Sequence, residues 1–125
     1  MTIVGYDHAQ MLCPPGAEDQ ARAYWGDLIS LVEVDKPESL RARGGVWFRC
    51  GRDGLHIGAE PDFSPATRAH LCIRVSDVAA FDALCERLTA AGYAVDHADE
   101  PIAERRMKTH DCFGNLVEFV VGTTG

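Results

Sequence analysis

The sequence predicts an α+β domain built from two tandem βαβββ modules, each with the order strand, helix and three strands. Two amphipathic helical stretches occupy equivalent places in the two halves of the chain, and each follows one extended segment and precedes three more. A constant offset of 62 positions also relates three pairs of residues: His8 and His70, His56 and Glu118, and Cys50 and Cys112. We therefore expect module one at residues 1–62 and module two at residues 63–125.

Apolar residues recur at helical spacing in the first half, after the turn Pro14-Pro15-Gly16. This stripe predicts a helix and consists of Ala17, Ala21, Tyr24, Trp25, Leu28 and Leu31. One strand is expected before the helix, at residues 3–11, and three after it, at residues 32–34, 46–50 and 55–60. Residues 62–67, which have prolines within and beside them, are the expected linker between the halves.

The second half repeats this order with a clearer helix. Its apolar stripe consists of Val78, Phe81, Leu84, Cys85, Leu88 and Ala91. Ser76 or Asp77 is the expected N-cap, and Gly92 the expected end of the helix. Strands are expected before it at residues 69–75 and after it at residues 94–97, 105–111 and 116–121.

The composition is that of one globular domain. Of the 125 residues, 46% are hydrophobic and 25% are charged, and the net charge of −7 argues against nucleic acid or an anionic membrane surface as a partner. No window approaches the roughly 18 apolar residues of a spanning helix, and the N-terminus has no basic and apolar leader. The five cysteines are odd in number and never spaced as C-x-x-C, so we expect reduced thiols in a cytoplasmic protein.

Four polar residues interrupt the apolar pattern of the predicted strands. Because successive residues of a strand point to opposite faces, the apolar set of each strand packs on the helix and the other set faces away. The set that faces away includes His8, His56, His70 and Glu118. We therefore expect these four side chains on the sheet faces turned away from the helices.

Glu118 lies between Val117 and Phe119, where burial of a carboxylate is costly unless a partner neutralises it. A metal ion is one such partner, and an ion pair with Arg74 or Arg106 is the alternative. Three imidazoles and one carboxylate suit zinc, nickel, manganese, cobalt or iron. The residues thus favour a divalent metal site formed by His8, His56, His70 and Glu118.

These residues resemble the vicinal oxygen chelate superfamily, which includes glyoxalase I, fosfomycin-resistance and bleomycin-resistance proteins, methylmalonyl-CoA epimerase and extradiol dioxygenases. The resemblance covers essentially the whole chain. It is carried by residues 6–8 (Tyr-Asp-His), 69–71 (Ala-His-Leu) and 111–119 (Asp-Cys-Phe-Gly-Asn-Leu-Val-Glu-Phe). The last segment is similar to the family signature Asp-Pro-x-Gly-Asn-x-x-Glu, with Cys112 in the proline position.

The resemblance implies curved mixed sheets that enclose a metal and substrate cavity, and a homodimer. It also implies metal ligands from the first and fourth strands of each module, which are His8, His56, His70 and Glu118 here. His56 departs from the family, because glyoxalase I has glutamate and the epimerase glutamine at that place. One of the two glutamates of the glyoxalase proton shuttle is therefore missing.

The chemistry implied by the resemblance is that of a metal-dependent lyase, isomerase or glutathione-transferring enzyme, in which the metal binds neighbouring substrate oxygens. Glu118 is the ligand able to act also as a base. The alternatives are a metal-free sequestering protein of the bleomycin-resistance type and an Fe(II) ring-cleaving dioxygenase that uses His8, His70 and Glu118.

Contacts to a small-molecule substrate are expected from one aromatic and several basic residues. Trp47 fits either a pocket wall or core packing, and His110 fits either a substrate contact or a surface position. Arg105 and Arg106 are neighbours in a strand, so one points inward, where it suits a carboxylate, phosphonate or phosphate oxygen. The candidate substrate-binding residues are Trp47, Arg74, Arg106 and His110.

Overall fold

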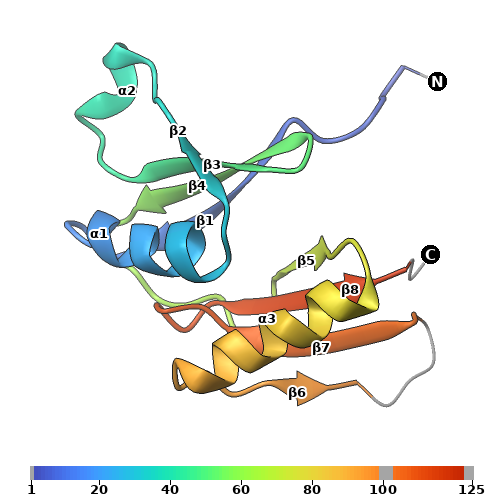
Figure 1. Ribbon diagram of the computed structural model, residues 1–125. Coiled ribbons are helices and arrows are strands. Elements are labelled where there is room, and N and C mark those ends of the chain that lie inside the picture. Colours follow the sequence, from blue (N-terminus) through green and yellow to red (C-terminus); the bar gives the residue numbers. More distant parts are fainter. Residues whose placement is uncertain (1, 99–102, 123–125) are drawn as a thin grey trace. The chain divides into compact units, whose positions relative to one another are not determined.

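The computed structural model describes residues 2–98 and 103–122 (Figure 1). The chain divides into two compact units, Met1–Ser64 and Pro65–Gly125. Each unit contains one four-stranded mixed sheet and one main helical segment between its first and second strands. The predicted α+β class with two tandem βαβββ modules is confirmed.

Unit one contains four strands and three short helical segments. In chain order they are β1 (His8–Cys13), α1 (Glu18–Ala21), η1 (Arg22–Leu28), β2 (Val32–Val34), α2 (Glu38–Arg41), β3 (Val46–Cys50) and β4 (Asp53–Ala59). The sheet order is β1-β4-β3-β2, with β1 parallel to β4 and the other pairs antiparallel. The central strand β4 therefore lies between β1 and β3.

Strand alternation decides which residues of unit one form its core. Leu55 and Ile57 of β4 and Val46 and Phe48 of β3 are buried, together with Trp25 of the helical segment. The intervening residues, which include Trp47 and His56, lie on the opposite face of the sheet because the strand period is two.

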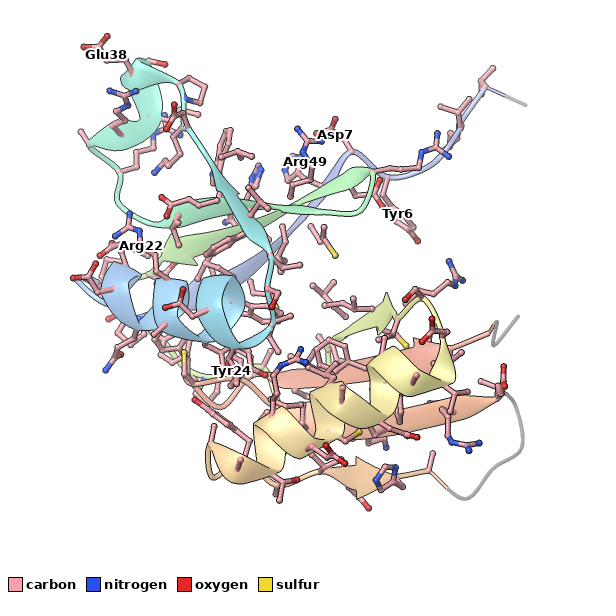
Figure 2. The ribbon with its side chains drawn as sticks, viewed as in Figure 1. Tyr6, Asp7, Arg22, Tyr24, Glu38 and Arg49 are labelled. Atoms are coloured by element: carbon pink, nitrogen blue, oxygen red, sulfur yellow. The ribbon has the colours of Figure 1, made fainter. Side chains whose placement is uncertain are left out.

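The helical segment of unit one differs from the predicted continuous α-helix. Only one α-helical turn forms before the backbone widens into the π-helix Arg22–Leu28. In a π-helix each N–H donates to the carbonyl five residues earlier, and here the N–H of Ile29 donates to the carbonyl of Tyr24 at 2.9 Å. The π-helix accompanies the burial of two adjacent aromatic rings, Tyr24 and Trp25, which pack edge to face with centroids 5.0 Å apart. Figure 2 shows Arg22 and Tyr24 on this segment.

Two further features of unit one differ from the prediction. Strand β1 begins at His8 rather than at residue 3, and the preceding residues Ile3, Val4 and Tyr6 are exposed. Helix α2 was not predicted, because a single turn carries no apolar periodicity; it follows Pro37, whose φ of −54° suits a helix start.

The link between α2 and β3 depends on two glycines. Gly44 and Gly45 have φ values of 73° and 85°, in the left-handed region. The N–H of Gly45 donates to Oε1 of Glu18 at 3.0 Å, and this bond holds the pKa of the Glu18 carboxyl below its usual value. A Cβ at Gly45 would lie 2.4 Å from the carbonyl oxygen of Ile57, so β3 approaches β4 here as closely as glycine permits.

Unit two contains β5 (Leu71–Arg74), α3 (Val78–Ala90), β6 (Asp96–His97), β7 (Arg105–His110) and β8 (Leu116–Val121). The sheet order is β5-β8-β7-β6, with β5 parallel to β8. Figure 1 shows α3 lying across one face of this sheet. The expected strand at residues 94–97 is shorter than predicted, because only Asp96 and His97 pair with β7.

Helix α3 forms as the sequence predicts. Asp77 is the N-cap, since its side chain accepts a hydrogen bond from the N–H of Ala80 at 2.8 Å. The helix ends before Gly92, which has a φ of 92°. The apolar stripe buries Phe81, Leu84 and Leu88 in the core of the unit.

The turn that leads into β8 is fixed by Asp111 and Asn115, both buried. Oδ1 of Asp111 accepts from the N–H groups of Phe113 and Asn115, each at 2.9 Å, and Oδ2 accepts from the Asn115 amide at 3.1 Å. Oδ1 of Asn115 accepts in turn from the N–H of Ala66 at 3.0 Å. The Asp and Asn of the signature segment therefore set the start of the strand that carries Glu118.

Two expectations from composition concern membrane-spanning helices and the state of the cysteines. No helix within residues 2–98 and 103–122 has the length and apolar character needed to cross a membrane. All five cysteines fall inside those ranges, and none of them forms a disulfide.

Candidate functional site

The most buried charge among the candidate residues is Glu118, on the face of the unit-two sheet opposite α3. Its side chain is 3% exposed. Nε of Arg106 donates to its Oε1 at 2.7 Å, and Nε2 of His70 contacts its Oε2. The sequence left Arg74 and Arg106 open as partners of this carboxylate, and the structure selects Arg106.

Strand register alone does not separate the two arginines, because Arg74 of β5 and Arg106 of β7 both pair with Val120, two residues from Glu118. Lys108 is the direct cross-strand partner of Glu118, and Arg106 lies two residues away on the same face of β7. That diagonal position is within reach of a long side chain. Arg74 lies on β5, and its Nε donates instead to the carbonyl of Gly122 at 3.1 Å.

The other ring nitrogen of His70 determines what its contact with Glu118 means. Nδ1 lies 2.8 Å from the carbonyl oxygen of Arg68. Because a carbonyl only accepts, Nδ1 carries the hydrogen, and Nε2 of a neutral ring is then an acceptor. An acceptor nitrogen would thus face an acceptor carboxylate oxygen. That contact requires a cation: either a proton on Nε2 or a metal ion bound by both atoms.

Unit one contains a second pair, His8 of β1 and His56 of β4. Their rings are stacked with centroids 4.3 Å apart and an interplanar angle of 15°. Trp47 of β3 stacks on His56 at 3.9 Å and 2°. Since β4 lies between β1 and β3, the ring of His56 is held between the other two rings. Trp47 therefore lies on the histidine face of the sheet and not in the core beneath the helical segment.

Neighbouring groups orient and tune these imidazoles. Nδ1 of His8 lies 2.8 Å from Oδ2 of the exposed Asp7, which Figure 2 shows in the segment before β1. Such a carboxylate fixes the ring tautomer and leaves Nε2 as the donor atom toward a metal. Burial, and then the neighbouring His8, lowers the pKa of His56, which favours its neutral form.

Glycine keeps the space beside this pair open. A Cβ at Gly54 would lie 3.1 Å from Cβ of His8 and 3.2 Å from Nε2 of His56. A Cβ at Gly58, the next residue on this face of β4, would lie 2.9 Å from the side-chain nitrogen of Gln10. The sequence pattern alone predicts no role for Asp7, Gly54 or Gln10, although Gly54, His56 and Gly58 alternate in one strand, which indicates a face with open space beside the histidine.

The remaining candidates are less closely tied to these pairs. His110 is exposed at the end of β7, where it pairs with Leu116. Arg105 is also exposed, and its Nη1 donates to the carbonyl of Glu104 at 3.0 Å. Burial raises the pKa of the Cys50, Cys72 and Cys85 thiols, which disfavours reactive thiolates.

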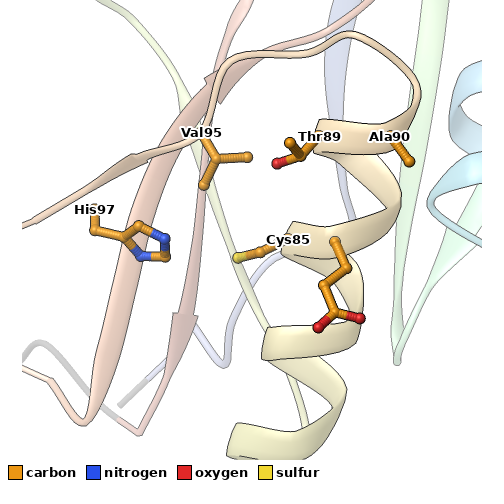
Figure 3. Close-up of a pocket in the computed structure, with 6 residues that line it drawn as sticks. Cys85, Thr89, Ala90, Val95 and His97 are labelled. Carbon is orange, nitrogen blue, oxygen red and sulfur yellow. The ribbon is translucent and has the colours of Figure 1, made fainter.

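An open hollow of about 440 Å³ lies in unit two between α3 and the segment that contains β6 (Figure 3). Its lining consists of Cys85, Glu86, Thr89, Ala90, Val95 and His97. It belongs to the helix side of the sheet, and none of the candidate ligands or substrate-binding residues lines it. The hollow is thus separate from the His70 and Glu118 pair.

The four predicted metal ligands are therefore found as two pairs, His8 with His56 and His70 with Glu118. Across residues 2–98 and 103–122, no three His, Cys, Asp or Glu side chains come together as a group that could hold a metal ion.

Comparison with solved structures supports the fold. A protein from Bacillus anthracis assigned to the glyoxalase family is 39% identical, with a TM-score of 0.90 over 98% of each chain. Lactoylglutathione lyase from Agrobacterium tumefaciens is 22% identical, with a TM-score of 0.75 over 98% of this chain and 96% of the lyase. The fosfomycin resistance protein FosX from Listeria monocytogenes is 17% identical, with a TM-score of 0.74 over 98% and 96%. The latter two similarities concern the fold alone.

A search of curated proteins finds no match to the chain. The family comparison, in contrast, matches residues 7–119. This match extends from the residue before His8 to the residue after Glu118, and it confirms the resemblance seen in the sequence. The chain belongs to the Glyoxalase/Bleomycin resistance protein/Dioxygenase superfamily.

Proposed function

We propose that this protein is a small metal-dependent enzyme of the vicinal oxygen chelate type, with His8, His56, His70 and Glu118 as its metal ligands. The observation that carries the proposal is the contact between Nε2 of His70 and Oε2 of Glu118, where two acceptor atoms converge and either a proton or a metal ion is required. Imidazole nitrogen and carboxylate oxygen are the donors that zinc, nickel, manganese, cobalt and iron accept.

The surroundings of the histidines support the same interpretation. Metal-bound histidines usually donate their second ring N–H to a carboxylate or a carbonyl. His8 has Asp7 in that position, and His70 has the carbonyl of Arg68. The lowered pKa of His56 favours the neutral ring that can bind a metal. The donor set therefore fits a divalent metal ion.

A bound divalent metal supplies Lewis acidity, which draws two neighbouring substrate oxygens to it and stabilises the negative charge that develops on them. Asp7 and Arg68 orient the imidazoles of His8 and His70. Glu118 is the one carboxylate among the ligands and the proposed proton acceptor. It would hold that proton at Oε2 once this oxygen has left the metal, because Oε1 is bonded to Arg106. Lyase, isomerase and glutathione-transfer reactions would share the role of the metal, and the proton-acceptor role of Glu118 would serve isomerase-type reactions.

The substrate is proposed to be a small molecule that contacts Trp47, Arg74, Arg106 and His110. We also propose a homodimer and a cytoplasmic location, the latter supported by five cysteines that form no disulfide.

A metal-free ligand-binding protein is the second candidate. It is favoured by the ion pair between Arg106 and Glu118, because this pair, together with a protonated His70, neutralises the buried carboxylate without a metal. The two candidates differ in what they predict for metal uptake.

Titration of the chelator-treated protein with Co²⁺, followed by visible absorption, tests the proposal. We expect wild-type protein to bind about one equivalent, and His8→Ala and His70→Ala each to weaken binding by more than about 100-fold, because each removes a ligand rather than a residue that orients one. His97→Ala is the matched control, since His97 lines the separate hollow on the helix side of unit two, and it should bind like wild type. Absence of Co²⁺ binding by wild type, or equal binding by all variants, would overturn the proposal in favour of the metal-free protein.

A further inference from the structure

Glu118 presents its two oxygens to different partners, and this division is set by Arg106. Oε1 accepts the 2.7 Å hydrogen bond from Nε of Arg106, whereas Oε2 faces Nε2 of His70. The carboxylate is almost completely buried, and the Arg106 side chain is itself mostly buried at 19% exposure. A charge-assisted bond between two buried groups restricts rotation of the carboxylate.

We propose that Arg106 is a positioning residue that makes Glu118 a one-oxygen metal ligand, with Oε2 as the coordinating atom. This inference rests on the proposed function. A carboxylate that is free to rotate can bind a metal through both oxygens, and each additional oxygen occupies a coordination position. By engaging Oε1, Arg106 would leave Oε2 as the oxygen that Glu118 offers to a metal, and a metal held through one oxygen would have more room for a substrate oxygen.

The position of Arg106 in the sheet supports a role in orientation rather than in simple charge balance. It reaches Glu118 diagonally from β7, although Lys108 is the direct cross-strand partner of Glu118 and is also cationic. The planar guanidinium offers donors in a fixed geometry, which the ammonium group of lysine does not. The structure thus uses the residue that can fix one oxygen of the carboxylate.

The test compares wild type, Arg106→Met and Arg106→Lys with Co²⁺ as the probe. Its visible spectrum depends on coordination number, and its binding curve gives the affinity. In Arg106→Met we expect a weaker absorption band, as Glu118 becomes bidentate, and a Co²⁺ affinity about 10- to 100-fold lower, the usual cost of losing a group that orients a ligand. Arg106→Lys should restore part of the affinity but not the wild-type spectrum.

Arg105→Met is the matched control, because Arg105 is the exposed neighbour on the same strand and bonds to the carbonyl of Glu104. It should leave both spectrum and affinity unchanged. If Arg106→Met binds Co²⁺ with the wild-type spectrum, or binds it as tightly as wild type or more tightly, the positioning role is overturned. If wild type itself binds no Co²⁺, the proposed function has failed instead, so the two failures are distinguishable. Circular dichroism of each variant establishes that it is folded.

Discussion

Glu118→Gln is expected to reduce metal affinity by more than about 100-fold and to lower the free energy of unfolding of the metal-free protein by about 2–3 kcal/mol. Glutamine keeps the shape of the side chain but removes its charge. The metal would lose its only anionic ligand, and Arg106 would lose the carboxylate with which it forms a 2.7 Å ion pair. A neutral partner at a position where the side chain is only 3% exposed cannot replace that interaction.

The two effects are measured separately, by Co²⁺ titration and by urea unfolding in the presence of a chelator. Glu86→Gln is the control, because Glu86 is an exposed residue of α3 and the substitution removes the same charge. It should change neither quantity appreciably. Wild-type metal affinity in Glu118→Gln would remove Glu118 from the ligand set, and unchanged stability would show that its pair with Arg106 contributes little.

Gly45→Ala is expected to destabilise the protein by about 3 kcal/mol, the sum of left-handed backbone strain and overpacking. The added Cβ would lie 2.4 Å from the carbonyl oxygen of Ile57, which is a backbone atom and cannot rotate away. Strand β4 or the start of β3 must therefore move, and β4 carries His56 next to Ile57.

Gly51→Ala separates the two contributions. Gly51 also has a positive φ, of 61°, but a Cβ there meets no atom within 4 Å. This variant should lose only about 1 kcal/mol from backbone strain. Urea unfolding of both variants makes the comparison. Equal destabilisation would show that the close approach of β3 to β4 does not constrain this part of the sheet.

Much of the fold could be predicted from residue pattern because its strands and longest helix are held by side-chain burial. The bounds of β2, β3 and β8 agree with the prediction, and α3 begins after the expected cap Asp77. The pattern failed where backbone bonding alone defines the element. The single turn α2 has no distinctive side-chain spacing, and the apolar stripe around η1 predicts a helix but not its π form.

Strand alternation predicts one part of the candidate site, namely the sheet faces on which its residues lie. It assigns His56 and Glu118 to the faces opposite the helices, where the structure has them. It does not decide between Arg74 and Arg106, because both pair with Val120, two residues from Glu118. The hydrogen bonds of the two side chains make that distinction: Arg106 donates to Glu118, and Arg74 donates to the carbonyl of Gly122. Strand alternation also does not predict the two groups that orient the imidazoles. Asp7 is the sequence neighbour of His8, and the group that contacts His70 is the backbone carbonyl of Arg68.

The claim that both histidine-containing pairs serve one metal ion is tested most directly by anomalous diffraction from crystals of the metal-loaded protein, recorded at the absorption edge of the bound metal. The account predicts one anomalous peak for each protein chain. This peak should lie about 2.0–2.2 Å from Nε2 of His70 and Oε2 of Glu118, and the imidazoles of His8 and His56 should also contact it. A crystal without such a peak, or a peak that none of these four side chains contacts, would contradict the account.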